Sequence, residues 1–426
     1  MEPAFGVSPG RRRGTVRTMR ILIATDSYPP LIGGATQAGR LLAQELRGRG
    51  HAVHVATIAQ PNTPAVEDDD GVPVTRLTAT VLRGNRVSAD PYRRVPPPFP
   101  DPELTLGLRR LIAEFRPDVV HSYGWLSYSC AIACGRSTPL LLSARDYGNV
   151  CAVRTLVRHG ERCSGPALGK CLECAGSFYG RAKGTAAVVG VLGGRRLLRR
   201  RMDGLHSVSR FVETQMREHL LDGRHVAEAV IPDFRPDGHA AGEDGRAADL
   251  PDEPYVVFVG ALRRVKGIEV LLDAWAGLDA APALVLVGTR APDTPASFPD
   301  GVHVVYDAPG PAVLEAFDRA LFAVAPSVWA EPLGNVVHEA QSRGRAVIGT
   351  APGGHEDMID DGLDGLLVAP GDAPALREAM AHLLADPALA GRMGDAGRLR
   401  ADRFTAARVV PAFEELYAEL LERSTT

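Results

Sequence analysis

The chain has 426 residues, of which 45% are hydrophobic and 23% are charged, and its formal net charge at pH 7 is −3. A chain of this length exceeds what one hydrophobic core usually supports, so two domains are expected. The nearly balanced charge gives no general attraction to nucleic acid or to anionic membranes, and no nucleic-acid partner is expected. Since no run of eighteen apolar residues occurs, the sequence predicts no membrane-spanning helix.

The N-terminal segment is basic and lacks the apolar core of a secretory signal peptide. We interpret residues 1–18 as a disordered basic arm, or as an over-long start with Met19 as the initiator, and the sequence leaves both open. Without a secretory signal we expect a cytoplasmic protein. Disulfides are then disfavoured.

Short β runs alternate with amphipathic helices over residues 19–237. Strands are predicted at 20–25, 52–58, 72–77, 119–121 and 140–143, with helices at 102–115 and 209–220. This alternation is typical of a parallel sheet covered by helices on both faces. We therefore expect a Rossmann-like N-terminal domain.

A segment rich in Gly, Asp, Ala and Pro interrupts this rhythm, and we place a linker at 238–253. A second series follows over 254–405, with strands predicted at 255–259, 283–287, 302–306, 321–325 and 346–349. The fold class is therefore α/β, with two Rossmann-like doubly wound domains facing a cleft. Residues 406–426 form a last helix that could cross back onto the N-terminal domain.

The most informative stretch is PSVWAEPLGNVVHEA, residues 326–340. Pro332 suits the first turn of a helix, which puts Glu331 at the helix entrance and Glu339 two turns further along. Eight helical residues span about 12 Å, more than the roughly 5–9.5 Å between paired glycosidase carboxylates. The two carboxylates suit opposite ends of a long ligand, and the amides near Gly334 and Asn335 suit a diphosphate. Together these features indicate a nucleotide sugar; the alternative is a helix with two ordinary surface glutamates.

Two glycine-containing turns are further candidates for ligand binding. The turn GALRRVKG at 260–267 carries Arg263, Arg264 and Lys266, whose charges would neutralise a departing nucleoside diphosphate. Its alternative is a solvated basic loop. Gly33 and Gly34 lie in the first strand-to-helix turn and would let backbone amides approach a ligand. A plain turn is the alternative there.

Four cysteines occupy a stretch of twenty-four residues inside a Gly-rich segment, which forms an insertion at about 148–176. Their spacing, C-x11-C-x7-C-x2-C, suits a tetrahedral structural zinc, and the residues are Cys151, Cys163, Cys171 and Cys174. An iron–sulfur cluster is less favoured. Unligated or adventitiously paired cysteines are the remaining alternative. Cys130 and Cys134 stand at helical spacing in an apolar run and are interpreted as core residues.

From Glu331 to Asp372 the chain resembles the donor domain of glycosyltransferase family 4, a class of retaining enzymes. The matching stretches are EPLGNVVHEA and PGGHEDMIDDGLDGLLVAPGD, supported by YPPLIGG, GHAVHV, PDVVH and HSVSRF earlier in the chain. The resemblance implies a GT-B fold, with the acceptor on the N-terminal domain and the donor on the C-terminal one. It also implies that Glu331 contacts the transferred sugar and Glu339 the ribose, with Gly334 and Asn335 near the sugar and phosphates. No catalytic divalent metal is expected.

The chain departs from the family pattern at two positions. Lys266 matches the family's phosphate-loop lysine, but Ala261 stands where an arginine is common, so Arg263 or Arg264 would supply that charge. Arg145 stands where family members often carry a histidine that contacts the donor sugar. Arg145 could bond a sugar hydroxyl or a phosphate, or signify altered donor choice or weakened activity. The cysteine segment resembles an insertion found in a subset of the family.

The resulting hypothesis is a retaining hexosyltransferase that uses a nucleotide sugar of unknown base. Its acceptor is left open among a glycan, a lipid-linked sugar and a small molecule. The alternatives are a nucleotide-sugar epimerase of the same fold and a catalytically weak sugar-binding protein. A run of five arginines at 195–201 is interpreted as a solvated helix face, with peripheral contact to anionic lipid at the inner membrane face as the alternative.

Overall fold

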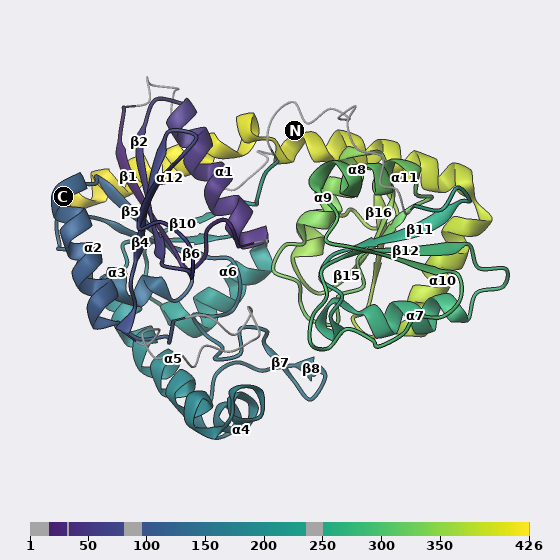
Figure 1. Ribbon diagram of the computed structural model, residues 1–426, viewed down its shortest axis with the longest axis horizontal. Coiled ribbons are helices and arrows are strands. Elements are labelled where there is room, and N and C mark those ends of the chain that lie inside the picture. Colours follow the sequence, from purple (N-terminus) through teal and green to yellow (C-terminus); the bar gives the residue numbers. More distant parts are fainter. Residues whose placement is uncertain (1–16, 32–33, 81–95, 236–249, 426) are drawn as a thin grey trace. The chain divides into compact units, whose positions relative to one another are not determined.

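The structure is a computed structural model that describes residues 17–31, 34–80, 96–235 and 250–425 (Figure 1). The chain divides into two compact units: residues 1–158, 163–232 and 409–426 form the first, and residues 159–162 and 233–408 form the second. Most of the expected N-terminal arm, Gly33 and most of the expected linker lie outside the described residues.

The first unit is built on an eight-stranded sheet among the described residues, in the order β10-β9-β6-β5-β1-β2-β4-β3. Neighbouring strands are parallel except β3 and β4, which are antiparallel. Residues 21–24 of β1 are completely buried, as expected for a central parallel strand covered on both faces. The strands are β1 (Arg20–Thr25), β2 (Ala52–Ile58), β3 (Val66–Asp69), β4 (Val72–Leu77), β5 (Val119–Tyr123), β6 (Leu140–Ala144), β9 (Gly204–Ser207) and β10 (Ala227–Val230).

In the first unit, the start of one helix, α2, is specified by the residues around it. Asp101 accepts the backbone N–H groups of Glu103 and Leu104, and Pro102 occupies the first turn of α2. These two devices explain why that helix begins where the sequence predicts. The helices are α1 (Gly34–Gly48), α2 (Pro102–Phe115), α3 (Leu126–Ala133), α4 (Leu168–Tyr179), α5 (Arg181–Arg201) and α6 (Arg210–Met216), which continues as a π-helical turn at Arg217–Leu221. A short hairpin, β7 (Val157–Arg158) and β8 (Glu161–Arg162), precedes α4.

The second unit has a six-stranded sheet in which every neighbouring pair is parallel, in the order β13-β12-β11-β14-β15-β16. Its strands are β11 (Tyr255–Val259), β12 (Ala283–Gly288), β13 (Val302–Tyr306), β14 (Ala323–Val324), β15 (Val347–Thr350) and β16 (Gly365–Val368). Its helices are α7 (Ile268–Ala276), α8 (Gly310–Arg319), α9 (Asn335–Ser342), α10 (Ala373–Ala385) and α11 (Pro387–Ala401). The prediction of two doubly wound α/β units is confirmed. Within the described ranges, no helix combines the length and apolar character that crossing a membrane requires.

The last helix, α12 (Ala406–Thr425), contributes most of its length to the first unit. Glu414 accepts two hydrogen bonds of 2.8 Å from the Arg49 guanidinium and lies 3.0 Å from His51 Nε2. One turn later, Tyr417 Oη lies 2.8 Å from Nδ1 of the buried His121. The first unit is thus completed by residues more than 290 positions downstream of their partners.

Glu414 sets a pH-dependent contribution to the stability of the first unit. Burial opposes its ionisation, but hydrogen bonds from His51 and Arg49 outweigh burial and lower its pKa from 4.5 to about 2. A carboxyl group with a depressed pKa contributes stability that is present above the unfolded-state value and is lost as the pH falls through the folded-state value.

We therefore expect Glu414→Gln to destabilise the protein by about 2 kcal/mol at neutral pH, which is several degrees of melting temperature. The difference from wild type should shrink below about pH 4. Differential scanning calorimetry across this range measures both effects. Glu419→Gln, which removes only an exposed pair with Arg423, is the control and should change little. An equal loss in both variants would contradict the assignment.

Candidate active site

The loop after β11 brings a lysine into contact with the segment that follows β14. The chain passes from Gly260 into a short 3-10 helix, Arg264–Lys266, and reaches Gly267 at φ +80°. A Cβ atom at Gly267 would lie 1.8 Å from the carbonyl oxygen of Pro326, so glycine permits this close approach. As a result Lys266 lies beside residues 327–331.

Lys266 and Glu331 form the centre of the candidate site. Lys266 Nζ lies 2.8 Å from both carboxylate oxygens of Glu331. The same carboxylate accepts Ser327 Oγ–H at 2.7 Å and Trp329 Nε1–H at 2.8 Å. The Glu331 side chain is 9% exposed, whereas that of Lys266 is 30% exposed, so the lysine is the more accessible member of the pair.

The charge state of Glu331 follows from these contacts. Burial acts to raise its pKa, but the positive charge of Lys266, with hydrogen bonds from Lys266 and Ser327, outweighs burial and the pKa is lowered. Glu331 is therefore a fixed carboxylate at neutral pH. Such a group can hold a polar ligand or orient the lysine, and it is a poor proton donor.

Helix α9 starts at Asn335, so the prediction that Pro332 occupies its first turn is wrong. Gly334 is the N-cap at φ +91°, and a Cβ there would lie 2.4 Å from His355 Nε2. Residues 331–333 are held by tertiary contacts, including a 2.6 Å bond from the Gly354 N–H to the carbonyl oxygen of Glu331. Because the helix begins after Gly334, Glu331 lies four residues before the first helical residue.

His355 is a buried group that faces this helix start. Its Nδ1 accepts the backbone N–H of Thr350 at 3.0 Å, which leaves the proton of the neutral ring on Nε2. Burial lowers the pKa of His355 to about 4, so the ring is neutral at physiological pH. Nε2 has no hydrogen-bond partner among the described residues and lies next to Gly334. It is available as a donor.

Asn335 and Glu339 lie on α9 itself. Asn335 Nδ2 donates to Asp233 Oδ2 at 3.0 Å, which fixes the first residue of the helix. Glu339 lies one turn further and is partly buried. Burial raises the pKa of Glu339 from 4.5 to about 7.

The two arginines of the loop at 260–267 point to local acidic partners. Arg263 Nε donates to Asp293 Oδ1 at 3.1 Å. The Arg264 guanidinium donates to Glu269 at 3.0 and 3.2 Å, and its side chain is 71% exposed. Lys266 is thus the cation of this loop that contacts Glu331.

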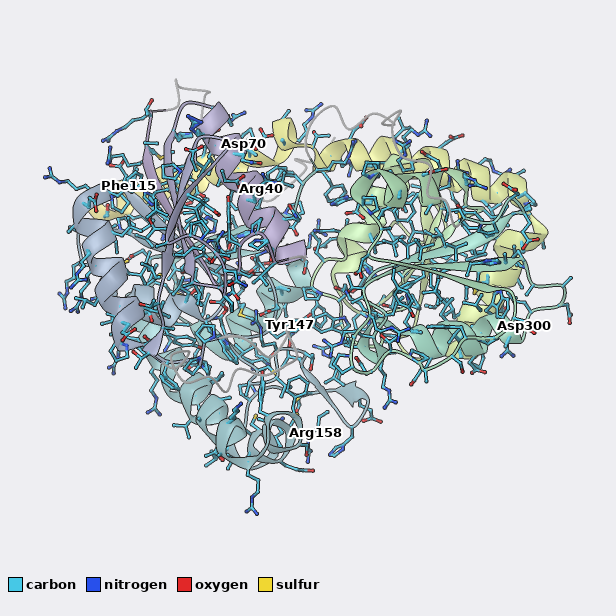
Figure 2. The ribbon with its side chains drawn as sticks, viewed as in Figure 1. Arg40, Asp70, Phe115, Tyr147, Arg158 and Asp300 are labelled. Atoms are coloured by element: carbon cyan, nitrogen blue, oxygen red, sulfur yellow. The ribbon has the colours of Figure 1, made fainter. Side chains whose placement is uncertain are left out.

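The other predicted site residues belong to the first unit. Arg145 follows β6, with its guanidinium 5.8 Å from the centre of the Tyr123 ring; the nearby Tyr147 is labelled in Figure 2. Gly34 is the first residue of α1. The four cysteines of the insertion also lie in this unit, and all four are free thiols. Within the described residues, no group of three or more His, Cys, Asp or Glu has the arrangement of a formed metal site.

Sequence reasoning missed three residues of this site: Ser327, Trp329 and His355. Each lies in one of the two stretches that resemble the family or lead into them, but its residue type did not indicate its role. Ser327 and Trp329 became visible only through their bonds to Glu331. His355 became visible only through its packing against Gly334.

Two family models match the chain. One, described as glycosyl transferase 4-like domain, matches residues 33–233. The other, described as glycosyl transferases group 1, matches residues 253–386. The second match contains Lys266, Glu331 and Glu339.

Proteins of similar sequence are named as glycosyltransferases or as a sugar-phosphate synthase. The chain is 26% identical over 308 residues to D-inositol 3-phosphate glycosyltransferase 1 of Catenulispora acidiphila, covering 67% of this chain and 68% of that protein. It is 25% identical over 400 residues to a D-inositol 3-phosphate glycosyltransferase of Xylanimonas cellulosilytica, covering 90% of both chains. It is also 36% identical over 170 residues to alpha-maltose-1-phosphate synthase of Mycobacterium tuberculosis, but that match spans only 35% of this chain and 43% of the synthase.

Solved structures share the fold over nearly the whole chain. Sucrose-phosphate synthase from Thermosynechococcus elongatus has a TM-score of 0.72 at 23% identity, covering 95% of this chain and 100% of that one. Anabaena Alr3699/HepE in complex with UDP and glucose has a TM-score of 0.64 at 16% identity, covering 94% and 100%. The catalytic domain of Arabidopsis thaliana starch synthase IV, bound to ADP and acarbose, has a TM-score of 0.65 at 13% identity, covering 96% and 100%.

The raised pKa of Glu339 predicts that this carboxyl group lowers the free energy of unfolding at high pH. The folded protein holds a proton that the unfolded chain releases between pH 4.5 and about 7, so the free energy of unfolding falls as the pH rises through this interval. We expect Glu339→Gln to melt at a higher temperature than wild type at about pH 8, and the gain to shrink towards about pH 5.

Thermal melts at these two pH values test this prediction. Glu378→Gln, which changes an exposed glutamate on α10, is the matched control and should show no pH-dependent gain. A constant difference between Glu339→Gln and wild type at both pH values would contradict the raised pKa.

Proposed function

The chain belongs to glycosyltransferase family 4, whose members have the two-domain GT-B fold, and we propose that it transfers a hexose-type sugar from a nucleoside diphosphate to an acceptor hydroxyl with retention. The observation that carries this proposal is the contact of Lys266 with Glu331, which lies four residues before the first residue of α9. It places a cation, a fixed carboxylate and a helix N-terminus together in the second unit.

The proposed donor contacts follow from the charge of each group. The diphosphate is anionic, so Lys266 and the amides at Gly334 and Asn335 would bind it. Glu331 can accept hydrogen bonds from sugar hydroxyls once Lys266 turns to the phosphates, and the His355 Nε2–H adds a donor near Gly334. Glu339, one turn into α9, would accept the ribose hydroxyls. Two structural neighbours are described as complexes with UDP and with ADP, which supports a nucleoside diphosphate here.

The transfer can proceed without a side-chain base. The bond between the anomeric carbon and the diphosphate oxygen breaks, and the acceptor oxygen bonds the same carbon from the same face. The acceptor proton passes to the departing phosphate oxygen, so atoms and charge balance. Lys266 and the helix amides stabilise the negative charge that develops on the leaving group, usually the largest contribution in such sites.

The acceptor is proposed only as a hydroxyl-bearing molecule in the cytoplasm. Three of the five arginines in the basic run of α5 form hydrogen bonds or ion pairs within the first unit. Arg195 donates to the carbonyl oxygen of His219, Arg199 pairs with Asp222, and Arg201 donates to the carbonyl oxygen of Ala131. The remaining two arginines of the run are exposed. These contacts support a solvated helix face over a lipid-binding surface.

A thermal-shift titration with UDP, GDP, dTDP and ADP tests the donor class. A nucleotide at one hundred times its dissociation constant stabilises the folded state by about 2.7 kcal/mol. We expect a shift with one of the four nucleotides, and its loss in Glu339→Ala. Glu378→Ala on α10 is the control and should keep the shift. No shift with any nucleotide would contradict the proposal.

Lys266→Ala should lower the transfer rate by about 100-fold or more, because the leaving group loses the cation that stabilises it. The buried Glu331 carboxylate also loses its positively charged partner. The assay measures nucleoside diphosphate release from the donor, with and without acceptors, and analyses the anomeric configuration of the product by NMR. The exposed Lys183→Ala on α5 is the control. Interconversion of donor sugars without acceptor would indicate an epimerase, and full activity in Lys266→Ala would contradict the assigned role.

A further inference from the structure

The four cysteines of the insertion surround one small cavity in the first unit. The cavity has a volume of about 20 Å³, and its wall includes Cys151, Cys163, Cys171 and Cys174 together with apolar side chains. A space of this size accommodates about one water molecule or one small ion. Four cysteines from a stretch of twenty-four residues therefore converge on a space that fits a single atom.

Three separate pieces of backbone bring these sulfurs together. Cys151 lies in the turn that follows β6, and Cys163 comes directly after β8. Cys171 and Cys174 lie three residues apart in the first two turns of α4, so they share one helix face. A C-x2-C pair on one element, completed by cysteines from two others, is a common arrangement of structural zinc ligands.

The backbone after Cys151 folds into a tight turn, in which the Arg154 N–H donates to the Cys151 carbonyl oxygen at 3.1 Å. Burial raises the pKa of the Cys151 thiol, and the backbone amides of residues 153–156 act in the opposite direction. Arg154 and Leu156 adopt φ values of +68° and +52°, which are costly for residues with side chains. Similarly, the Ala167 N–H donates to Cys171 Sγ at 3.4 Å. Backbone turns that aim several N–H groups at one point are typical of anion and metal–sulfur sites.

The charges around the cavity also fit a metal–thiolate group. Four thiolates together carry more negative charge than one Zn²⁺ ion neutralises, and the cavity wall includes the cationic side chains of Arg158, labelled in Figure 2, and Lys170. Lys170, whose Nζ donates to Ser164 Oγ at 2.8 Å, can offset part of the excess charge at close range, whereas Arg158 is already paired with Glu173. The thiols of Cys163 and Cys174 donate to backbone carbonyl oxygens at 3.5 and 4.0 Å, and these weak bonds cost little to give up.

We propose that these four cysteines bind one Zn²⁺ ion in a tetrahedral tetrathiolate site. Binding turns the four sulfurs inward from the positions in which they line the cavity. Each thiol that ligates the ion releases its proton to solvent, so no oxidant or reductant is needed.

The site would order a segment that reaches the main sheet. Arg154, three residues after Cys151, pairs with Asp146 at 2.6 Å and lies 3.9 Å from Asp26. Asp26 follows β1 and accepts the N–H groups of two residues just beyond β5. Strand order reverses between β1 and β5, where doubly wound sheets bind ligands. Zinc would therefore fix the position of Arg154 at this edge of the sheet.

Metal analysis of the full-length protein, purified from zinc-supplemented culture and dialysed against a weak chelator, tests the proposal. We expect about one zinc ion per chain, released when a mercurial reagent titrates the thiols. Replacement of zinc by Co²⁺ should produce the visible absorption of a tetrahedral cobalt–thiolate centre. Both readouts use the wild-type chain and are independent of glycosyl transfer, so failure of the proposed function leaves them interpretable.

Variants separate the four cysteines from the other two. Cys174→Ser should lose most of the bound zinc, whereas Cys134→Ala, which changes a buried core cysteine outside the cavity, should retain it. Absence of zinc with four freely reactive thiols in the native protein would overturn the proposal. Disulfides found by mass spectrometry, or iron with acid-labile sulfide, would also overturn it.

Discussion

The ion pair between Lys266 and Glu331 is the interaction on which the candidate site depends. It joins the loop after β11 to the segment after β14, and these strands are neighbours in the sheet of the second unit. The pair costs desolvation, because Glu331 is almost fully buried, and three donors offset this cost. The other groups of the site are placed relative to this contact, since Gly334 caps α9 just after Glu331 in the chain and His355 packs against that cap.

Much of the fold was predictable because its strands are buried on both faces. The interiors of runs such as residues 20–25 and 255–259 are apolar, and their predicted boundaries match the structure. The start of α2 was also predictable, because Asp101 and Pro102 encode it locally. The predicted strand at 321–325 is shorter in the structure, where only Ala323–Val324 is regular.

The site was predictable in part, and the reason for each failure is physical. The Glu-x7-Glu spacing located Glu331 and Glu339, but the helix start was misplaced because Gly334 and the packing of Gly354 decide it, and both are tertiary features. The partners of the two loop arginines are acidic residues that sequence position alone does not reveal. The convergence of the four cysteines on one cavity likewise depends on a hairpin and a helix that periodicity did not predict.

The pairing of Glu414 with Arg49, across 365 positions, has a consequence for the order of folding during synthesis. Domains generally fold as they leave the ribosome, the N-terminal one first. Here the first unit lacks Glu414 and Tyr417 until α12 has been translated, whereas the second unit is contained within residues 159–408. The unit synthesised second can therefore fold completely before the first unit acquires the contact between His121 and Tyr417. Translation of α12 is then the step that completes the first unit.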